Sequence, residues 1–217
     1  MKRILFLFAL LLFFTGCSIK NIDDNQIDDI IDDALKTEIN GTNVIFEGYK
    51  YYLPRGMQVV DKKEYNSIIL SNGSYYYLYV DVVSYYHKNS VDFSINKGLY
   101  FSKKMSYNGK EGYIEIDSKD DDTYLLKVVY NYAKIEVCIS KEELENSIYN
   151  SIIILSSITY NDTILNSLVG DATFDYQEEE YDLFDSKRED GTFLDYIEEY
   201  DFYNENGNLK DEDVLDS

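Results

Sequence analysis

Two Asn-Gly dipeptides, each between runs of strand-forming residues, constrain the fold of this chain more than any other feature. Asn72-Gly73 lies between residues 67–71 and 74–86, and Asn108-Gly109 lies between residues 99–107 and 111–117. A two-residue hairpin turn places both of its central residues at positive φ, which Asn and Gly adopt most readily. The sequence therefore predicts two β-hairpins with antiparallel strands.

Other short runs extend this β pattern along the chain. Residues 44–46 and 49–53 flank the tight turn Glu47-Gly48, residues 124–130 and 134–139 flank Asn131, and residues 158–160 are a candidate for a last short strand. Most of these segments are joined by turns too short for a crossover connection. We therefore expect the pairing to be mostly antiparallel.

One long helix is expected late in the chain. Ser140-Lys-Glu-Glu143 has the pattern of a capping box, in which the Ser hydroxyl and the Glu carboxylate satisfy backbone amides of the first turn. Apolar residues at helical spacing follow and predict a helix to about residue 156: Leu144, Ile148, Ile152 and Leu155. Residues 90–97, closed by Gly98, are a shorter candidate. The predicted fold class is α+β, a mostly antiparallel, hairpin-rich sheet packed by the long helix, with one or two short helices.

A short amphipathic helix is predicted before the first strand. Apolar residues recur at helical spacing among aspartates, and they are Ile27, Ile30, Ile31, Ala34 and Leu35. Such a stripe buries itself against another element. It either docks on the domain or serves as a separate partner-binding helix.

The first residues have the layout of a secretory signal peptide. Lys2 and Arg3 precede an apolar run of 11 residues, 4–14. This run is too short to cross a bilayer, which takes roughly 20 apolar residues. A positive start, a short apolar middle and small residues at the end are typical of a peptide that is removed from the mature protein.

The end of this peptide resembles the lipobox of bacterial lipoproteins. Phe14-Thr15-Gly16-Cys17 matches the usual Leu-Ala/Ser-Gly/Ala-Cys except at its first position. The resemblance implies cleavage before Cys17, acylation of that cysteine, palmitate included, and attachment to a membrane. It also implies a location in the bacterial cell envelope, with the domain facing outside the cytoplasm. The alternative is an ordinary signal peptide followed by a chance cysteine.

Charge divides the rest of the chain into a tether, a domain and a tail. Residues 17–38 hold seven acidic and two basic residues, residues 39–170 hold 16 and 13, and residues 171–217 hold 18 and three. The tether carries the amphipathic helix, 39–170 is the globular domain, and the acidic-aromatic tail is expected to be disordered. This acidity argues against nucleic acid as a partner. The tail either only solubilises the protein or binds a basic protein partner through its aromatic and acidic side chains.

The order of elements in the domain is similar to that of PsbP/Mog1-type domains. Tyr52-Leu53-Pro54-Arg55-Gly56 comes early, and two strands followed by a helix come late. The resemblance covers residues 40–165 and implies an α/β/α sandwich. It supplies no catalytic residues.

One strand presents a candidate ligand surface. Alternation within residues 74–86 sends one set of side chains to the core (Tyr76, Leu78, Val80 and Val82) and another to the opposite face (Tyr75, Tyr77, Tyr79, Asp81 and Tyr85). Aromatic rings beside a carboxylate suit glycan rings or a peptide. The alternative is that a helix or neighbouring strand covers this face.

The inventory of catalytic residues is thin. Cys138 is the only cysteine besides Cys17, His87 is the only histidine, and nothing in the sequence brings the two together. The carboxylates at 117–122 lack the spacing of a calcium-binding loop. No cofactor or metal is expected. The sequence favours a non-enzymatic binding or accessory domain for an envelope component; the alternatives are a carboxylate-dependent cell-envelope enzyme and a structural tether acting through the tail.

Overall fold

The computed structural model describes residues 23–63, 65–120 and 122–170. The large sheet contains β3 (Gln58–Lys63), β4 (Asn66–Ser71), β5 (Ser74–Val80), β6 (Phe101–Tyr107), β7 (Lys110–Ser118), β8 (Thr123–Tyr130) and β9 (Ala133–Ser140). The small sheet contains β1 (Val44–Ile45), β2 (Tyr49–Tyr51) and β10 (Thr159–Tyr160). The helices are α2 (Asp24–Lys36), α3 (Val82–His87), α4 (Leu144–Ser157) and α5 (Asp162–Gly170), and a 3-10 helix, Lys141–Glu143, directly precedes α4.

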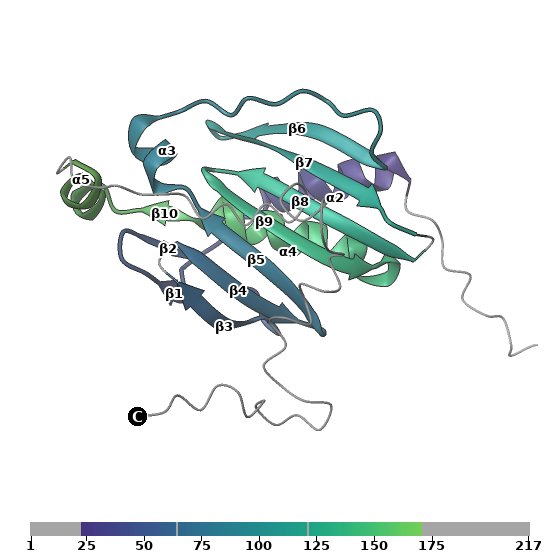
Figure 1. Cartoon of the computed structure of the whole chain (residues 1–217), viewed down its shortest axis with the longest axis horizontal. Helices are drawn as coiled ribbons and strands as arrows, with labels where there is room; N and C mark the ends of the chain where they lie inside the picture. Colours follow the sequence, from purple (N-terminus) through teal and green to yellow (C-terminus); the bar gives the residue numbers. More distant parts are fainter. Residues whose placement is uncertain (1–22, 64, 121, 171–217) are drawn as a thin grey trace, which may run out of the picture. The chain divides into compact units, whose positions relative to one another are not determined.

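The predicted α+β class is confirmed. The seven-stranded sheet has the order β3-β4-β5-β9-β8-β7-β6, the three-stranded sheet has the order β1-β2-β10, and every pairing is antiparallel (Figure 1). The predicted signal peptide, Cys17 and the predicted tail 171–217 lie outside the described residues. Within the described residues, no helix is long and apolar enough to cross a membrane.

The Asn-Gly turns form as predicted. Asn72 and Gly73 have φ of 50° and 83°, and Asn108 and Gly109 have φ of 51° and 75°. A third turn of this kind joins β8 to β9, where Asn131 has φ of 55° and the next residue, Tyr132, has φ of 60°. These three turns set the register of the hairpins β4–β5, β6–β7 and β8–β9.

The core lies between one face of the large sheet and α4. Residues of β8 and β9 on that face are buried, among them Leu126, Val128, Ile135 and Val137. The predicted apolar face of α4 meets them, since Leu144, Ile148, Ile152 and Leu155 are at most 1% exposed. The long helix is thus confirmed, with its end at Ser157.

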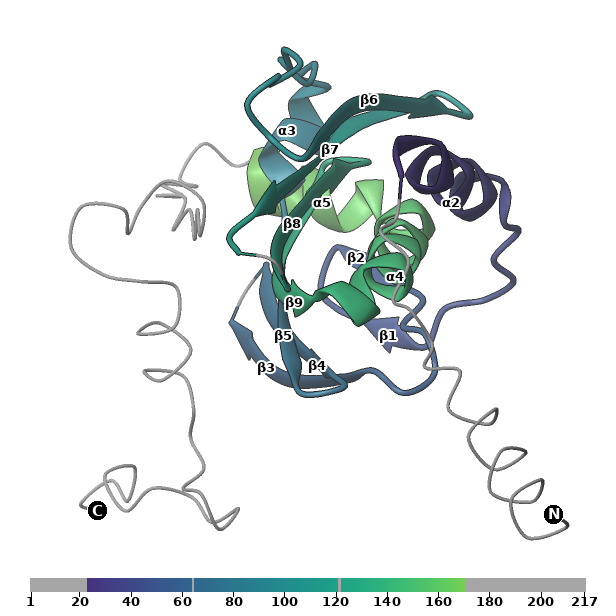
Figure 2. The same ribbon diagram turned by 90° about the vertical axis from the view of Figure 1, so that its right-hand side faces the viewer.

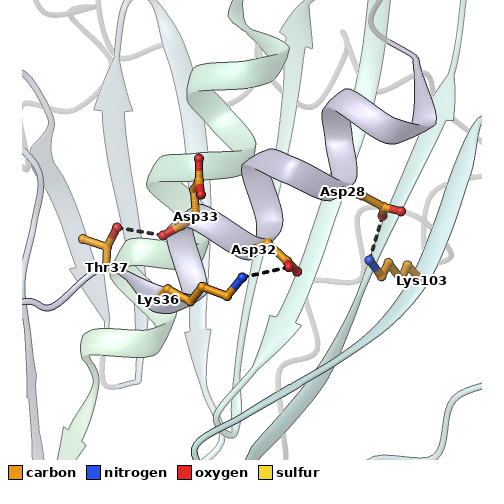
Figure 3. Close-up of polar contacts among 6 residues, drawn as sticks. All are labelled: Asp28, Asp32, Asp33, Lys36, Thr37 and Lys103. Carbon is orange, nitrogen blue, oxygen red and sulfur yellow. Dashed lines mark hydrogen bonds and ion pairs between the residues drawn. The ribbon is translucent and has the colours of Figure 1, made fainter.

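Helix α2 docks on the domain rather than standing apart. It lies beside α4 on the same face of the large sheet (Figure 2), and Ile27, Ile31 and Ala34 are buried. Asp23 and Gln26 form a capping box at its start. On its outer side, Asp28 accepts a 2.7 Å hydrogen bond from Lys103 of β6, and Asp32 pairs with Lys36 (Figure 3).

Three local predictions are wrong. Residues 90–97 contain no helix. The strand expected to continue to residue 86 ends at Val80 and gives way to α3. The predicted capping box does not form, because Ser140 makes no side-chain capping bond. The Glu143 carboxylate instead accepts a 3.1 Å hydrogen bond from Asn72 Nδ2 in the β4–β5 turn, so a tertiary contact replaces the local one.

Candidate functional site

The predicted tyrosine surface is divided between two places. Tyr76 faces α4, because its hydroxyl lies 2.7 Å from Ser147 Oγ of that helix. Alternation therefore puts Tyr75, Tyr77 and Tyr79 on the opposite face of β5. Because the strand ends at Val80, the two other expected members lie elsewhere, and they are Asp81 and Tyr85. The strand alternation that grouped the five residues therefore does not extend to Asp81 and Tyr85.

The sheet face that carries the three tyrosines also carries a row of charges. The register pairs Tyr77 with Glu136, Glu136 with Lys127, and Lys127 with Glu115. Glu136 is 1% exposed, and its carboxylate oxygens lie 4.0 Å from Lys127 Nζ and 3.6 Å from Lys134 Nζ. These charges neutralise one another. A ligand on this face would have to compete with them.

Asp81 at the start of α3 and Tyr85 within it both have structural roles. Asp81 caps the helix, since its carboxylate accepts a 2.7 Å hydrogen bond from the Ser84 amide. The Tyr85 ring stacks on Tyr160 of β10 at 3.8 Å, and its hydroxyl donates a 2.8 Å hydrogen bond to Asp162 of α5. These contacts join α3 to the elements that follow α4.

Cys138 has the environment of an unreactive thiol. It is half-buried on β9, and burial, with a smaller contribution from Asp120, raises its pKa to about 11. A thiol nucleophile needs the opposite shift. In the 117–122 turn, hydrogen bonds from the backbone amide of Asp122 and from Thr123 lower the pKa of the Asp120 carboxyl. Over the described residues, no group of three or more His, Cys, Asp or Glu side chains could hold a metal ion.

A hollow of about 370 Å³ lies beside α4. Ile39, from the segment after α2, and Ile153 of α4 supply apolar surface. Three rings line it as well, from Tyr52 and Pro54 after β2 and from Tyr149 of α4. Its volume falls within the range of small-molecule sites.

Hydrogen bonds fix the walls of this hollow. The Thr37 hydroxyl donates to the Asp33 carbonyl at 2.8 Å and lies 3.1 Å from the Tyr149 hydroxyl (Figure 3 shows the first contact). The Tyr52 amide donates to Ser157 Oγ at 2.9 Å. The Asn43 side chain bonds both backbone groups of Leu53, at 2.7 and 2.9 Å. The hollow is therefore held open by contacts of the protein itself.

The polar side chains around the hollow remain available. Within the described part of the chain, the side chains of Glu38, Asn40, Tyr52 and Asn150 make no hydrogen bond or ion pair. The charges on the sheet face, in contrast, are paired. Because unpartnered polar groups beside a fixed cavity offer specific contacts to a ligand, this hollow is the better candidate for a binding site.

Sequence reasoning missed this hollow. Its lining comes from the segment after α2, the segment after β2 and the middle of α4. None of these segments has a motif for ligand binding, although Tyr52 and Pro54 belong to the stretch that suggested the PsbP/Mog1 resemblance.

Comparison with known proteins adds no assignment: the chain matches no family model, no curated protein and no solved structure. The lipobox and PsbP/Mog1 resemblances therefore stay predictions from the sequence.

Proposed function

We propose that this chain is a lipid-anchored protein of the bacterial cell envelope whose domain binds an envelope component without catalysing a reaction. Cys17 carries the acyl chains, and the domain faces outside the cytoplasm. The observation that carries the binding function is the hollow beside α4, with its fixed walls and four unpartnered polar side chains. The acidic tail, 171–217, offers a second contact, to a basic protein partner.

The shifted carboxyl groups favour binding over a carboxylate-dependent enzyme. A carboxyl that acts as a general acid near neutral pH needs a raised pKa. Among the described residues, three carboxyl groups have lowered pKa values: Asp32 beside Lys36, Asp120 through hydrogen bonds, and Glu142 through hydrogen bonds from its own backbone and Ser140. These three groups are stabilised in the charged form.

Photo-crosslinking in the intact envelope tests this function. A photoreactive residue at position 52 is expected to capture a component of defined mass, because Tyr52 lines the hollow. The same residue at position 86, on α3, is the control and should not capture it. The yield of this product should also fall several-fold when Asn150→Ala is added. Equal products at both positions, or none at position 52, would contradict binding at the hollow.

A further inference from the structure

We infer that the hollow beside α4 binds a sugar ring of an uncharged envelope glycan. This inference rests on the proposed function, because it names the ligand of the same site. Three features of the hollow carry it: ring faces, unpartnered amide groups and the sign of its charge.

The ring faces match the apolar face of a sugar. A pyranose ring presents C–H groups on its faces and hydroxyls around its edge. The lining offers the rings of Tyr52, Pro54 and Tyr149, and apolar surface from Ile39 and Ile153. Tyrosine combines a broad apolar face with a polar tip, so that one side chain can contact both parts of a sugar. A lipid chain would fit less well, because four polar side chains surround this surface and would lose water.

The polar side chains match the hydroxyls of the sugar edge. The side-chain amides of Asn40 and Asn150 each carry an NH₂ donor and a carbonyl acceptor. Each amide can therefore bond two neighbouring hydroxyls of a sugar, donating to one and accepting from the other. Glu38 adds an acceptor, and the Tyr52 hydroxyl can donate or accept. Because these side chains have no partner within the described residues, they lose no protein hydrogen bond when the sugar binds.

Charge selects against anionic glycans. Among the described residues that line the hollow, Glu38 is the only one with a charged side chain. The domain itself, residues 39–170, holds 16 acidic and 13 basic residues and is slightly acidic. A uronic acid or phosphate-bearing polymer would meet repulsion at the site, from the Glu38 carboxylate. The ligand class is therefore a neutral hexose or N-acetylhexosamine.

Saturation-transfer NMR on the protein purified from membranes tests the assignment. The detergent must lack a sugar head group, which would compete for the site. The probes are neutral trisaccharides of N-acetylglucosamine and of glucose, and an anionic trisaccharide of galacturonic acid. We expect a neutral trisaccharide to bind with a Kd on the order of 1 mM, as is usual for few contacts in an open site. Its C–H protons should receive the transfer, and the anionic probe should receive none.

Variants locate the binding to the hollow. Tyr149→Ala should weaken binding at least about tenfold through lost stacking. Asn150→Ala should weaken it several-fold, and Tyr86→Ala, a helix tyrosine away from the hollow, should leave it unchanged. Glu38→Gln should admit the anionic trisaccharide. Circular dichroism checks that each variant is folded.

Two results would overturn the inference. One is no transfer to either neutral trisaccharide at about 10 mM, roughly ten times the expected Kd. The other is a Kd for the neutral trisaccharide that is unchanged in both Tyr149→Ala and Asn150→Ala. If the sugars fail while position 52 still crosslinks an envelope protein, the ligand class is wrong and the proposed binding function stands. If both experiments fail, the proposed function fails as well.

Discussion

Gly112 on β7 has no room for a side chain. A Cβ at this position would lie 1.9 Å from the Val129 carbonyl oxygen and 2.7 Å from the Tyr130 Cα. Both are backbone atoms of the neighbouring strand β8, so neither can move without distorting the sheet. We predict that Gly112→Ala lowers the free energy of unfolding by about 3 kcal/mol or more. Urea denaturation measures this change.

A glycine with space beside it is the matched control for Gly112. Gly98 has only Asn96 Oδ1, the end of a flexible side chain, within 4 Å of its added Cβ. Gly98→Ala should change the free energy of unfolding by less than about 1 kcal/mol. Equal effects of the two substitutions would contradict the close approach of β7 and β8.

Buried tyrosines make the fold sensitive to alkali. Burial raises the pKa of Tyr51 and of Tyr130 to about 12 each, from an ordinary value of 10.0. Above pH 10 the unfolded chain loses these protons while the folded chain keeps them. The unfolded state then binds fewer protons, and stability falls as pH rises. Below pH 10 the two states bind the same number, and this contribution is constant.

We predict that the free energy of unfolding falls above pH 10 by about 1.4 kcal/mol per pH unit for each such tyrosine. Urea denaturation at pH 8, 10 and 11 measures the slope. Tyr51→Phe should reduce this slope by the contribution of one tyrosine, about 1.4 kcal/mol per pH unit. A free energy of unfolding that is constant through pH 11 would show that these hydroxyls ionise as easily in the folded protein as in the unfolded chain.

The elements that carry their own pattern were predictable from the sequence, and those that depend on tertiary contacts were not. The Asn-Gly turns and the apolar face of α4 are local signals, and both are confirmed. Strand β3 was missed because its side chains are mostly exposed and show no alternation. It forms by pairing with β4. Helix α3 contains the β-branched and aromatic residues that are typical of a strand. The chain leaves the strand at Asp81, whose side chain caps α3 and whose backbone amide donates a hydrogen bond to the Tyr132 carbonyl.

The end of α4 is held by a side chain from the β8–β9 turn. Asn131 is 6% exposed, and its Nδ2 donates hydrogen bonds of 3.0 Å to both the Leu155 and the Ile158 carbonyl oxygens. Carbonyls in the last turn of a helix lack partners within the helix. We predict that Asn131→Ala lowers the free energy of unfolding by about 2–4 kcal/mol, since it loses both bonds and puts alanine, which tolerates a φ of 55° less well than asparagine, at this position.

Two further variants separate the amide of Asn131 from its backbone conformation. Asn131→Gly relieves the positive φ and loses only the hydrogen bonds, so its cost should be smaller than that of Asn131→Ala. Asn108→Ala has the same turn position, with φ of 51°, but its side chain is exposed, so it should cost only about 1 kcal/mol. Thermal or urea unfolding of the three variants gives the comparison. Equal losses for Asn131→Ala and Asn108→Ala would contradict a role of the amide in holding α4.

The hollow beside α4 is a property of the assembled domain, which explains why no stretch of sequence predicts it. Docking of α2 on α4 brings the segment after α2 against Tyr149, and Tyr52 and Pro54, which follow β2, complete the wall. The hollow begins at the C-terminal end of α2, and the helix has 13 residues, a length of about 20 Å. The proposed anchor, Cys17, precedes the other end of α2. The hollow and Asp23, the first described residue, therefore lie at opposite ends of α2.

The last prediction concerns the attachment of the whole protein to a membrane. The described residues contain no helix that could span a bilayer, and the net charge of −21 gives no attraction to anionic lipids. The acyl chains proposed for Cys17, three in lipoproteins of the class that its lipobox resembles, would exceed the two lipid signals needed for stable anchoring. We predict that Cys17→Ala releases the protein from the membrane fraction or stalls removal of residues 1–16. Fractionation and intact-mass measurement separate these results. Cys138→Ala is the control and should leave both the membrane partitioning and the mass of the attached lipid unchanged. The same unchanged partitioning and mass in Cys17→Ala would refute lipidation of Cys17.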